Sequence, residues 1–161
     1  MQQVIAEKVE QLAERLLARG WTVTAAESCT GGGVAMSITE LAGSSAWFEG
    51  SYVTYSNRLK ELMLGVSAST LKNFGAVSED VAAEMALGAR NNAGADLSIA
   101  ISGVAGPGGG TPEKPVGMVC FACACQDQPV SMQTCYFDGD RHDVRQQAIS
   151  HALQMLLDKL S

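Results

Sequence analysis

The chain has 161 residues, the length of one ordinary domain, and its 17 acidic and 11 basic side chains give a formal net charge of −6. Because phosphate backbones are bound by clusters of Lys and Arg, this acidic balance argues against a nucleic-acid-binding protein. With 47% hydrophobic and only 17% charged residues, the chain can bury a core of its own without disulfide bonds or a structural metal.

The first residues and the cysteines indicate the compartment. Charged residues such as Glu7 and Lys8 come before any long apolar run, so we expect no signal peptide. No apolar run approaches the ~20 residues that a membrane span requires. Five cysteines, an odd number in a chain without an export signal, are typical of reduced thiols. We therefore expect a cytoplasmic protein.

Hydrophobic spacing predicts alternating helices and strands. Apolar side chains recur at steps of three and four between residues 5 and 16, which predicts an amphipathic helix that ends at Gly20. The other elements are expected, in chain order, as strand 21–26, helix 34–41, strand 47–55, a short helix capped by Ser56 or Asn57, a helix capped by Ser78, strand 97–101, strands 116–125 and 130–137, and a helix over 144–155. This order predicts a single α/β domain over residues 1–161, a three-layer α/β/α sandwich whose closing hairpin makes the sheet mixed.

Polar or glycine-rich turns follow the first three predicted strands, at residues 27–33, 55–60 and 103–111. Ligands of open α/β sheets collect at the carboxyl ends of strands, so we expect these three turns to line one pocket. In the first turn, glycines let the backbone approach a ligand, and the following helix offers N–H groups to an anion or oxyanion. The alternative is that Ser28 or Thr30 only caps that helix.

Two residues of these turns are candidates for nucleophilic chemistry beside Ser28. Lys60 lies one helical turn after Ser56, and a desolvated lysine can lose its proton and activate a hydroxyl; the alternative is a solvated surface lysine. Cys29 would stand at a helix N-terminus, which lowers the pKa of a thiol, so it is a rival of Ser28 as the nucleophile.

The remaining motifs indicate neither a Walker-type nucleotide hydrolase nor a zinc site or histidine triad. The stretch 103–111 matches no established phosphate-binding fingerprint, although its glycines indicate more than a structural turn. His142 and His151 have no spacing that supports a Ser-His-Asp arrangement, and we expect both at the surface. Cys120 and Cys123 would face opposite sides of a strand, so we interpret them as buried small hydrophobic residues.

Several sequence blocks stand in order between Thr24 and Gly117. They include Glu27-Ser28-Cys29-Thr30-Gly31-Gly32, Tyr55-Ser56-Asn57 with Lys60, Ser102-Gly103-Val104-Ala105-Gly106-Pro107 and Lys114-Pro115-Val116-Gly117. Together they resemble the CinA C-terminal family. The chain departs from the usual pattern at Met118, where members commonly carry Thr.

The resemblance implies a three-layer α/β/α domain that hydrolyses the carboxamide of nicotinamide mononucleotide, a small-molecule nucleotide substrate, without a metal or organic cofactor. It implies Ser28 as the nucleophile, with Tyr55 and Lys60 as its partners. A homodimer is expected, and no nucleic-acid or membrane partner. Longer family members carry an additional N-terminal domain linked to hydrolysis of other nucleotides, and we expect that second activity to be absent.

An amide is unreactive, so its hydrolysis requires an activated nucleophile, donors for the tetrahedral oxyanion and a proton for ammonia. We expect neutral Lys60 to take the Ser28 proton and backbone N–H groups near Thr30 and Gly31 to hold the oxyanion. Candidate phosphate-binding groups are Gly106, Gly108, Gly109, Gly110 and Thr111, and Ser102 could serve either region. The alternative hypothesis is a catalytically silent nucleotide-binding or assembly module with the same fold.

Overall fold

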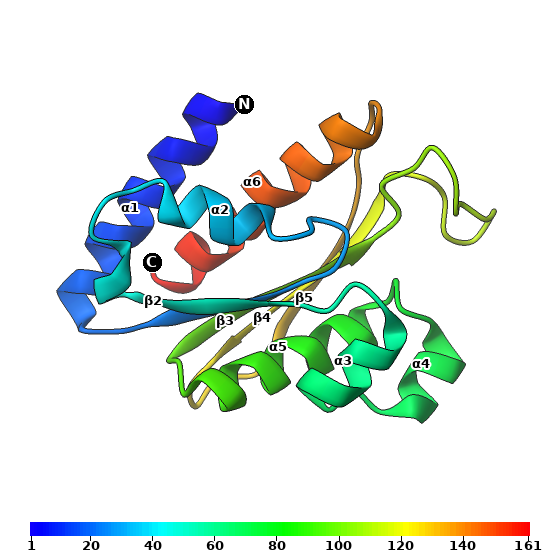
Figure 1. Cartoon of the computed structure of the whole chain (residues 1–161), viewed down its shortest axis with the longest axis horizontal. Helices are drawn as coiled ribbons and strands as arrows, with labels where there is room; N and C mark the ends of the chain where they lie inside the picture. The colour runs from blue at the N-terminus through cyan, green and yellow to red at the C-terminus, as the bar shows by residue number, and fades with distance from the viewer.

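A five-stranded sheet forms the centre of the computed structural model, which describes residues 1–161 (Figure 1). The strands are β1 (Val23–Glu27), β2 (Phe48–Val53), β3 (Leu97–Gly103), β4 (Met118–Cys125) and β5 (Ser131–Tyr136), in the order β2-β1-β3-β4-β5. β1 pairs in parallel with both β2 and β3, whereas β4 is antiparallel to β3 and to β5. The predicted mixed sheet is therefore confirmed, and the carboxyl ends of β1, β2 and β3 meet at one edge.

Helices cover both faces of this sheet (Figure 1). They are α1 (Gln2–Arg19), α2 (Gly33–Thr39), α3 (Asn57–Leu64), α4 (Ala68–Phe74), α5 (Glu79–Ala93) and α6 (Arg141–Lys159), with a 3₁₀ turn, η1, at Ser44–Ala46. α1, α2 and α6 pack on one face and α3, α4 and α5 on the other, which confirms the three-layer α/β/α sandwich. The sequence analysis missed α4, because this helix buries none of its residues and so shows no apolar periodicity.

Local sequence signals set the helix ends. Gly20 ends α1 in the left-handed region at φ 66°, as predicted. Ser56 caps α3 by accepting the Leu59 N–H at 3.2 Å, and Ser78 caps α5 by accepting the Val81 N–H at 3.2 Å. These caps fix where α3 begins, one turn before Lys60.

Small residues bring α3 and α5 close to the sheet and to each other. The sheet face toward α5 carries Ala100, Ala122 and Ala124, all buried. A Cβ at Gly88 of α5 would lie 2.0 Å from the backbone oxygen of Leu64 in α3, so only glycine allows this packing. The close contact holds α3, the helix that carries Lys60, against α5.

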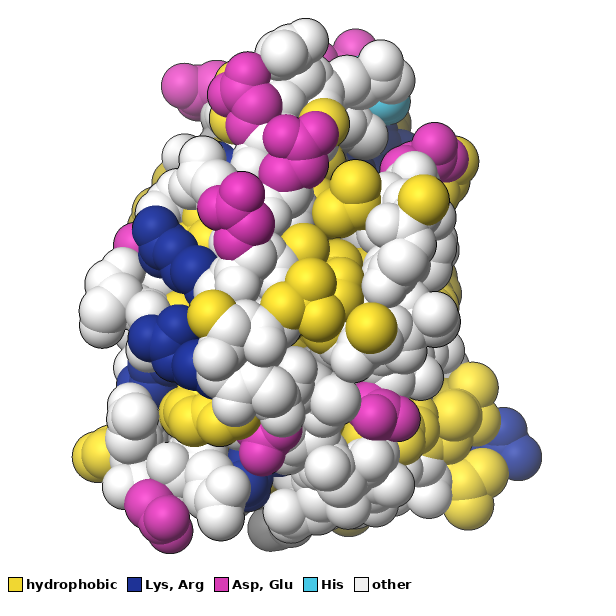
Figure 2. Space-filling view, turned by 90° about the vertical axis from the view of Figure 1, so that its left-hand side faces the viewer, with side chains coloured by type: hydrophobic (Ala, Val, Ile, Leu, Met, Phe, Trp, Pro, Cys, Tyr) yellow, Lys and Arg dark blue, Asp and Glu magenta, His cyan; other side chains and the backbone are white.

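The surface is mixed in character. Figure 2 shows most of the acidic side chains toward one end of one face, basic side chains along one flank and a hydrophobic strip down its middle. None of the helices combines the length and apolar character needed to cross a bilayer.

Candidate active site

A serine and a lysine meet at the carboxyl edge of the sheet. Ser28 directly follows β1, where its N–H donates to the Ile101 carbonyl at 3.0 Å. The Thr54 N–H donates to the Glu27 carbonyl at 2.9 Å and so ties the turn after β2 to the same place. Lys60 reaches in from α3, and its Nζ lies 3.0 Å from Ser28 Oγ. The structure therefore brings together two residues that are 32 positions apart in the chain.

The surroundings of Lys60 suit a neutral amine. The side chain is only 1% exposed, and burial lowers its pKa from the ordinary lysine value. Besides Ser28 Oγ, its Nζ contacts the Thr54 carbonyl at 2.8 Å and the Tyr55 carbonyl at 3.1 Å. A neutral amine has two N–H groups for the two carbonyls and a lone pair for the serine O–H. The position of Lys60 is therefore compatible with a base that accepts the Ser28 proton, and Lys60 is not a solvated surface lysine.

Cys29 is buried, and its thiol has no hydrogen bond to a lysine amine or to any other base. Burial raises the pKa of its thiol to about 11, and nearby Arg145 and Lys60 only partly oppose this. The predicted lowering of the Cys29 pKa is therefore wrong, because the thiol is desolvated and α2 begins only at Gly33, beyond the N-cap Gly32. Since the Lys60 amine contacts Ser28 and not the thiol, the geometry favours Ser28 as the nucleophile.

The N-terminus of α2 is occupied by a side chain that the sequence analysis did not single out. Glu27, the last residue of β1, is fully buried. Its carboxylate accepts hydrogen bonds from Thr30 Oγ1, the N–H groups of Gly32, Val34 and Ala35, and Ser51 Oγ. The expectation that the start of this helix offers free N–H groups to a ligand is therefore wrong, and neither Ser28 nor Thr30 caps it.

Two backbone N–H groups beside Ser28 have no oxygen acceptor. The N–H groups of Cys29 and Thr30 donate to no carbonyl or side-chain oxygen, whereas the Gly31 N–H donates to the Ser28 carbonyl at 3.0 Å. Of the two predicted oxyanion donors, the structure thus leaves the Thr30 N–H without an acceptor and engages that of Gly31, and it adds the N–H of Cys29. Cys29 lines the first cavity, whereas Thr30 and Gly31 line neither. No pattern in the sequence distinguishes these three amides.

Two adjoining cavities open at this edge of the sheet. The first, about 250 Å³, is lined by Ser28, Lys60, Tyr55, Ser102 and Arg141 among others. The second, about 660 Å³, shares Arg141 with the first and adds His142 and Arg145. Ser28 and Lys60 thus line the first cavity, Arg141 lines both cavities, and Arg145 lines the second.

The sequence analysis missed Arg141 and Arg145, which project from the first turns of α6. Arg141 Nη1 donates to the Gly106 carbonyl at 2.7 Å. Arg145 donates to the carbonyls of Cys29 and Thr30 at 3.1 and 3.2 Å, so it holds the turn that carries Ser28. Two arginines four residues apart at the start of a predicted helix lie on the same face of that helix, and this spacing could have indicated an anion-binding pair.

The remaining predicted site residues lie at different depths. Tyr55 is 63% exposed; its hydroxyl lies 3.4 Å from Arg141 Nη2, and it contacts Lys60 only through its carbonyl. Ser102 is 1% exposed, lines the first cavity and has no hydrogen-bond partner for its hydroxyl. Gly106 is buried beside Arg141.

The glycine-rich loop projects away from the body of the molecule (Figure 1). Gly108, Gly109, Gly110 and Thr111 are exposed and line neither cavity. Thr111 Oγ1 instead accepts the Lys114 N–H at 3.0 Å within the loop. The structure therefore does not bring this part of the loop to the Ser28–Lys60 pair.

The histidines and cysteines lie outside the Ser28–Lys60 pair. His142 is exposed, but His151 is half-buried against Phe121 with ring centroids 4.6 Å apart, so its expected surface position is wrong. Cys120 and Cys123 are buried in different cores on opposite faces of β4, as predicted. No three His, Cys, Asp or Glu side chains cluster in a way that could hold a metal ion.

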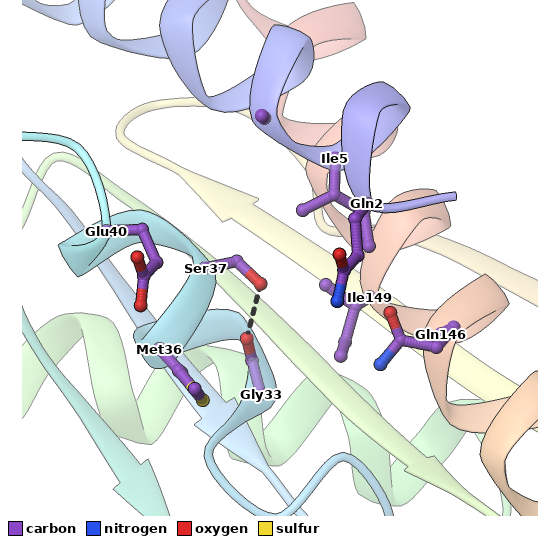
Figure 3. Close-up of a pocket in the computed structure, with 9 residues that line it drawn as sticks. Gln2, Ile5, Gly33, Met36, Ser37, Glu40, Gln146 and Ile149 are labelled. Atoms are coloured by element: carbon purple, nitrogen blue, oxygen red, sulfur yellow. Dashed lines mark hydrogen bonds between the residues drawn. The ribbon is translucent and has the colours of Figure 1, made fainter.

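A further depression lies between α1, α2 and α6 (Figure 3). It measures about 450 Å³, and its lining includes Ile5, Met36, Ile149 and Glu40. Its one drawn hydrogen bond joins Ser37 Oγ to the Gly33 carbonyl at 2.7 Å and belongs to the helix itself. Because it contains no paired nucleophile and base, the Ser28–Lys60 cavity is the candidate active site.

The family model for the CinA C-terminal domain matches residues 5–160, and the chain belongs to this family. Nicotinamide-nucleotide amidohydrolase PncC of Escherichia coli K12 is 56% identical over 91% of this chain and 89% of its own length. The PncC protein of Enterobacter agglomerans is 54% identical, over 91% and 90%. A crystal structure of a CinA superfamily protein from Klebsiella pneumoniae superposes with a TM-score of 0.93 at 42% identity, over 97% of both chains.

Proposed function

We propose that the protein is a nicotinamide-nucleotide amidohydrolase, which converts nicotinamide mononucleotide to nicotinate mononucleotide and ammonia. The observation that carries this proposal is the contact of 3.0 Å between Lys60 Nζ and Ser28 Oγ in a cavity of about 250 Å³. The names of the Escherichia coli and Enterobacter agglomerans relatives support the substrate.

In the first half-reaction, neutral Lys60 takes the proton of Ser28 while Oγ attacks the carboxamide carbon. The carbonyl oxygen becomes an oxyanion, which accepts hydrogen bonds from the N–H groups of Cys29 and Thr30. The Lys60 ammonium then donates its proton to the amide nitrogen. The C–N bond breaks, ammonia leaves, and an ester joins the nicotinoyl group to Ser28.

In the second half-reaction, water replaces ammonia. Neutral Lys60 takes a proton from this water, whose oxygen attacks the ester carbon, and the same two N–H groups hold the second oxyanion. Lys60 returns its proton to Ser28 Oγ as the ester bond breaks. The products are nicotinate mononucleotide and the regenerated serine. Tyr55 assists through its carbonyl, which with that of Thr54 keeps the lysine amine in place.

The rest of the substrate extends from the first cavity toward the second. Guanidinium groups bind phosphate through paired hydrogen bonds, so Arg141, which contacts Gly106, and Arg145 hold the 5′-phosphate. The unpartnered Ser102 hydroxyl supplies a hydrogen bond to the bound nucleotide. This arrangement predicts that a substrate without phosphate is used poorly.

We extend the proposal to the setting of the reaction. The product would feed the recycling of pyridine nucleotides, and all five cysteines are free thiols, as fits a reducing cytoplasm. We expect a homodimer, since small enzymes often pair through two-fold interfaces. Light scattering coupled to size-exclusion chromatography would give the mass in solution.

Ammonia release tests the function directly. Purified protein is incubated with nicotinamide mononucleotide, nicotinamide riboside or nicotinamide, each with a chelator present. We expect ammonia from the mononucleotide at a kcat/KM at least tenfold above that for the riboside. Tight binding of the mononucleotide without ammonia would favour the silent binding module instead.

A further inference from the structure

The Glu27 carboxylate is a buried charge that the proposed chemistry does not consume. It is 0% exposed and lies next to the nucleophile in the chain. A buried carboxylate is costly unless hydrogen bonds replace its hydration. Five donors surround Glu27: Thr30 Oγ1 at 2.7 Å, the N–H groups of Gly32, Val34 and Ala35 at 3.2, 2.9 and 3.1 Å, and Ser51 Oγ at 2.8 Å.

This donor set fits the ionised form of Glu27. An ionised carboxylate only accepts hydrogen bonds, whereas a protonated one would turn an O–H toward groups that are themselves donors. Three of the five donors are backbone N–H groups, which cannot reverse their role. The negative charge is therefore held at the start of α2, where the helix dipole also favours it.

The same contacts determine the path of the turn that carries the nucleophile. Oε1 binds both the Thr30 hydroxyl and the Gly32 N–H, and so pins the turn on either side of Gly31. Arg145 also holds this turn, through the carbonyls of Cys29 and Thr30. Between these two clamps, the only amides without an acceptor are those of Cys29 and Thr30.

We propose that Glu27 is a positioning residue for the oxyanion site: its carboxylate holds the turn 28–32 so that the Cys29 and Thr30 N–H groups stay free and face the reacting carbonyl. This inference rests on the proposed amidohydrolase function. Glu27 touches no reacting atom; it acts through Thr30 and the start of α2. A displacement of the donors by about 1 Å can cost 10²-fold in rate, because oxyanion stabilisation requires accurate placement.

Three variants separate positioning from simple structural support. Thr30→Val keeps the side-chain shape and removes the hydroxyl bond to Oε1, and Glu27→Gln replaces one acceptor oxygen by a donor. Ser51→Ala is the matched control, because it removes a bond of 2.8 Å from the other carboxylate oxygen, Oε2, away from the turn. Circular dichroism and thermal unfolding establish that each variant is folded at the assay temperature.

We expect Thr30→Val and Glu27→Gln to lower kcat at least tenfold with KM within threefold of wild type, because only the transition state carries the oxyanion. Ser51→Ala should keep kcat within threefold, even where it lowers the melting temperature. If Thr30→Val and Glu27→Gln are folded and keep kcat within threefold of an active wild type, the positioning role is refuted while the function stands. If wild-type protein releases no ammonia from nicotinamide mononucleotide, the function fails and this inference fails with it.

Discussion

Replacing Lys60 by Met removes the base and tests the neutral-amine interpretation. The amine lies 3.0 Å from Ser28 Oγ, and no other titratable side chain forms a hydrogen bond with that hydroxyl. General base catalysis contributes about 10²–10⁴-fold, so we expect kcat/KM to fall by about 10³, which corresponds to ~4 kcal/mol of transition-state stabilisation. Lys60→Arg should lose as much, because a guanidinium donates hydrogen bonds but cannot take a proton at neutral pH.

The assay is ammonia release from nicotinamide mononucleotide, with the folded state of each variant checked by circular dichroism. Methionine is buried readily, but the carbonyls of Thr54 and Tyr55 lose a donor, so some loss of stability is expected. Lys72→Met is the matched control: Lys72 is exposed on α4, and its removal should change kcat/KM less than twofold. A folded Lys60→Met protein that keeps more than a tenth of wild-type kcat/KM would refute the base role.

Three further outcomes follow from the same geometry. Burial lowers the pKa of Lys60, and only the neutral amine is a base. In a pH–rate profile, kcat/KM should therefore rise with pH to a plateau, with a midpoint below the ordinary lysine pKa of 10.5. A midpoint at or above 10.5 would contradict the neutral-amine interpretation. Tyr55→Phe should keep kcat within about threefold in the ammonia assay, because Tyr55 holds Lys60 through its carbonyl; a 10²-fold loss would assign the hydroxyl a chemical role. Thr54 Oγ1 is buried without a partner, so Thr54→Val should raise stability by about 1–2 kcal/mol in urea unfolding, and an unchanged midpoint would show that the hydroxyl is satisfied.

Features that depend on neighbouring residues could be predicted from the sequence. Gly20 ends α1, and Ser56 and Ser78 cap the starts of α3 and α5. These ends could be predicted because a cap contacts only the adjacent turn of its own helix. α4 could not be predicted, because it lacks the apolar spacing by which the other helices were recognised. It buries no side chain, so no periodic apolar pattern marks it.

The candidate site was only partly predictable. Sequence blocks pointed to Ser28 and Lys60, but the two carbonyls that hold the lysine amine depend on how the turn after β2 meets the end of β1. Arg145 reaches the nucleophile turn across 116 positions of the chain, and no local pattern encodes such a contact. The Cys29 pKa was mispredicted because burial, a tertiary property, dominates it.

Substitution of Ser28 and of Cys29 shows which of the two side chains is the nucleophile. Ammonia release from nicotinamide mononucleotide is measured for wild type, Ser28→Ala and Cys29→Ala, each shown to be folded. We expect Ser28→Ala to lose at least 10³-fold in kcat, of the order found when a nucleophile is removed, while Cys29→Ala stays within about threefold. A Cys29→Ala protein without activity beside an active Ser28→Ala protein would show instead that the thiol is the nucleophile.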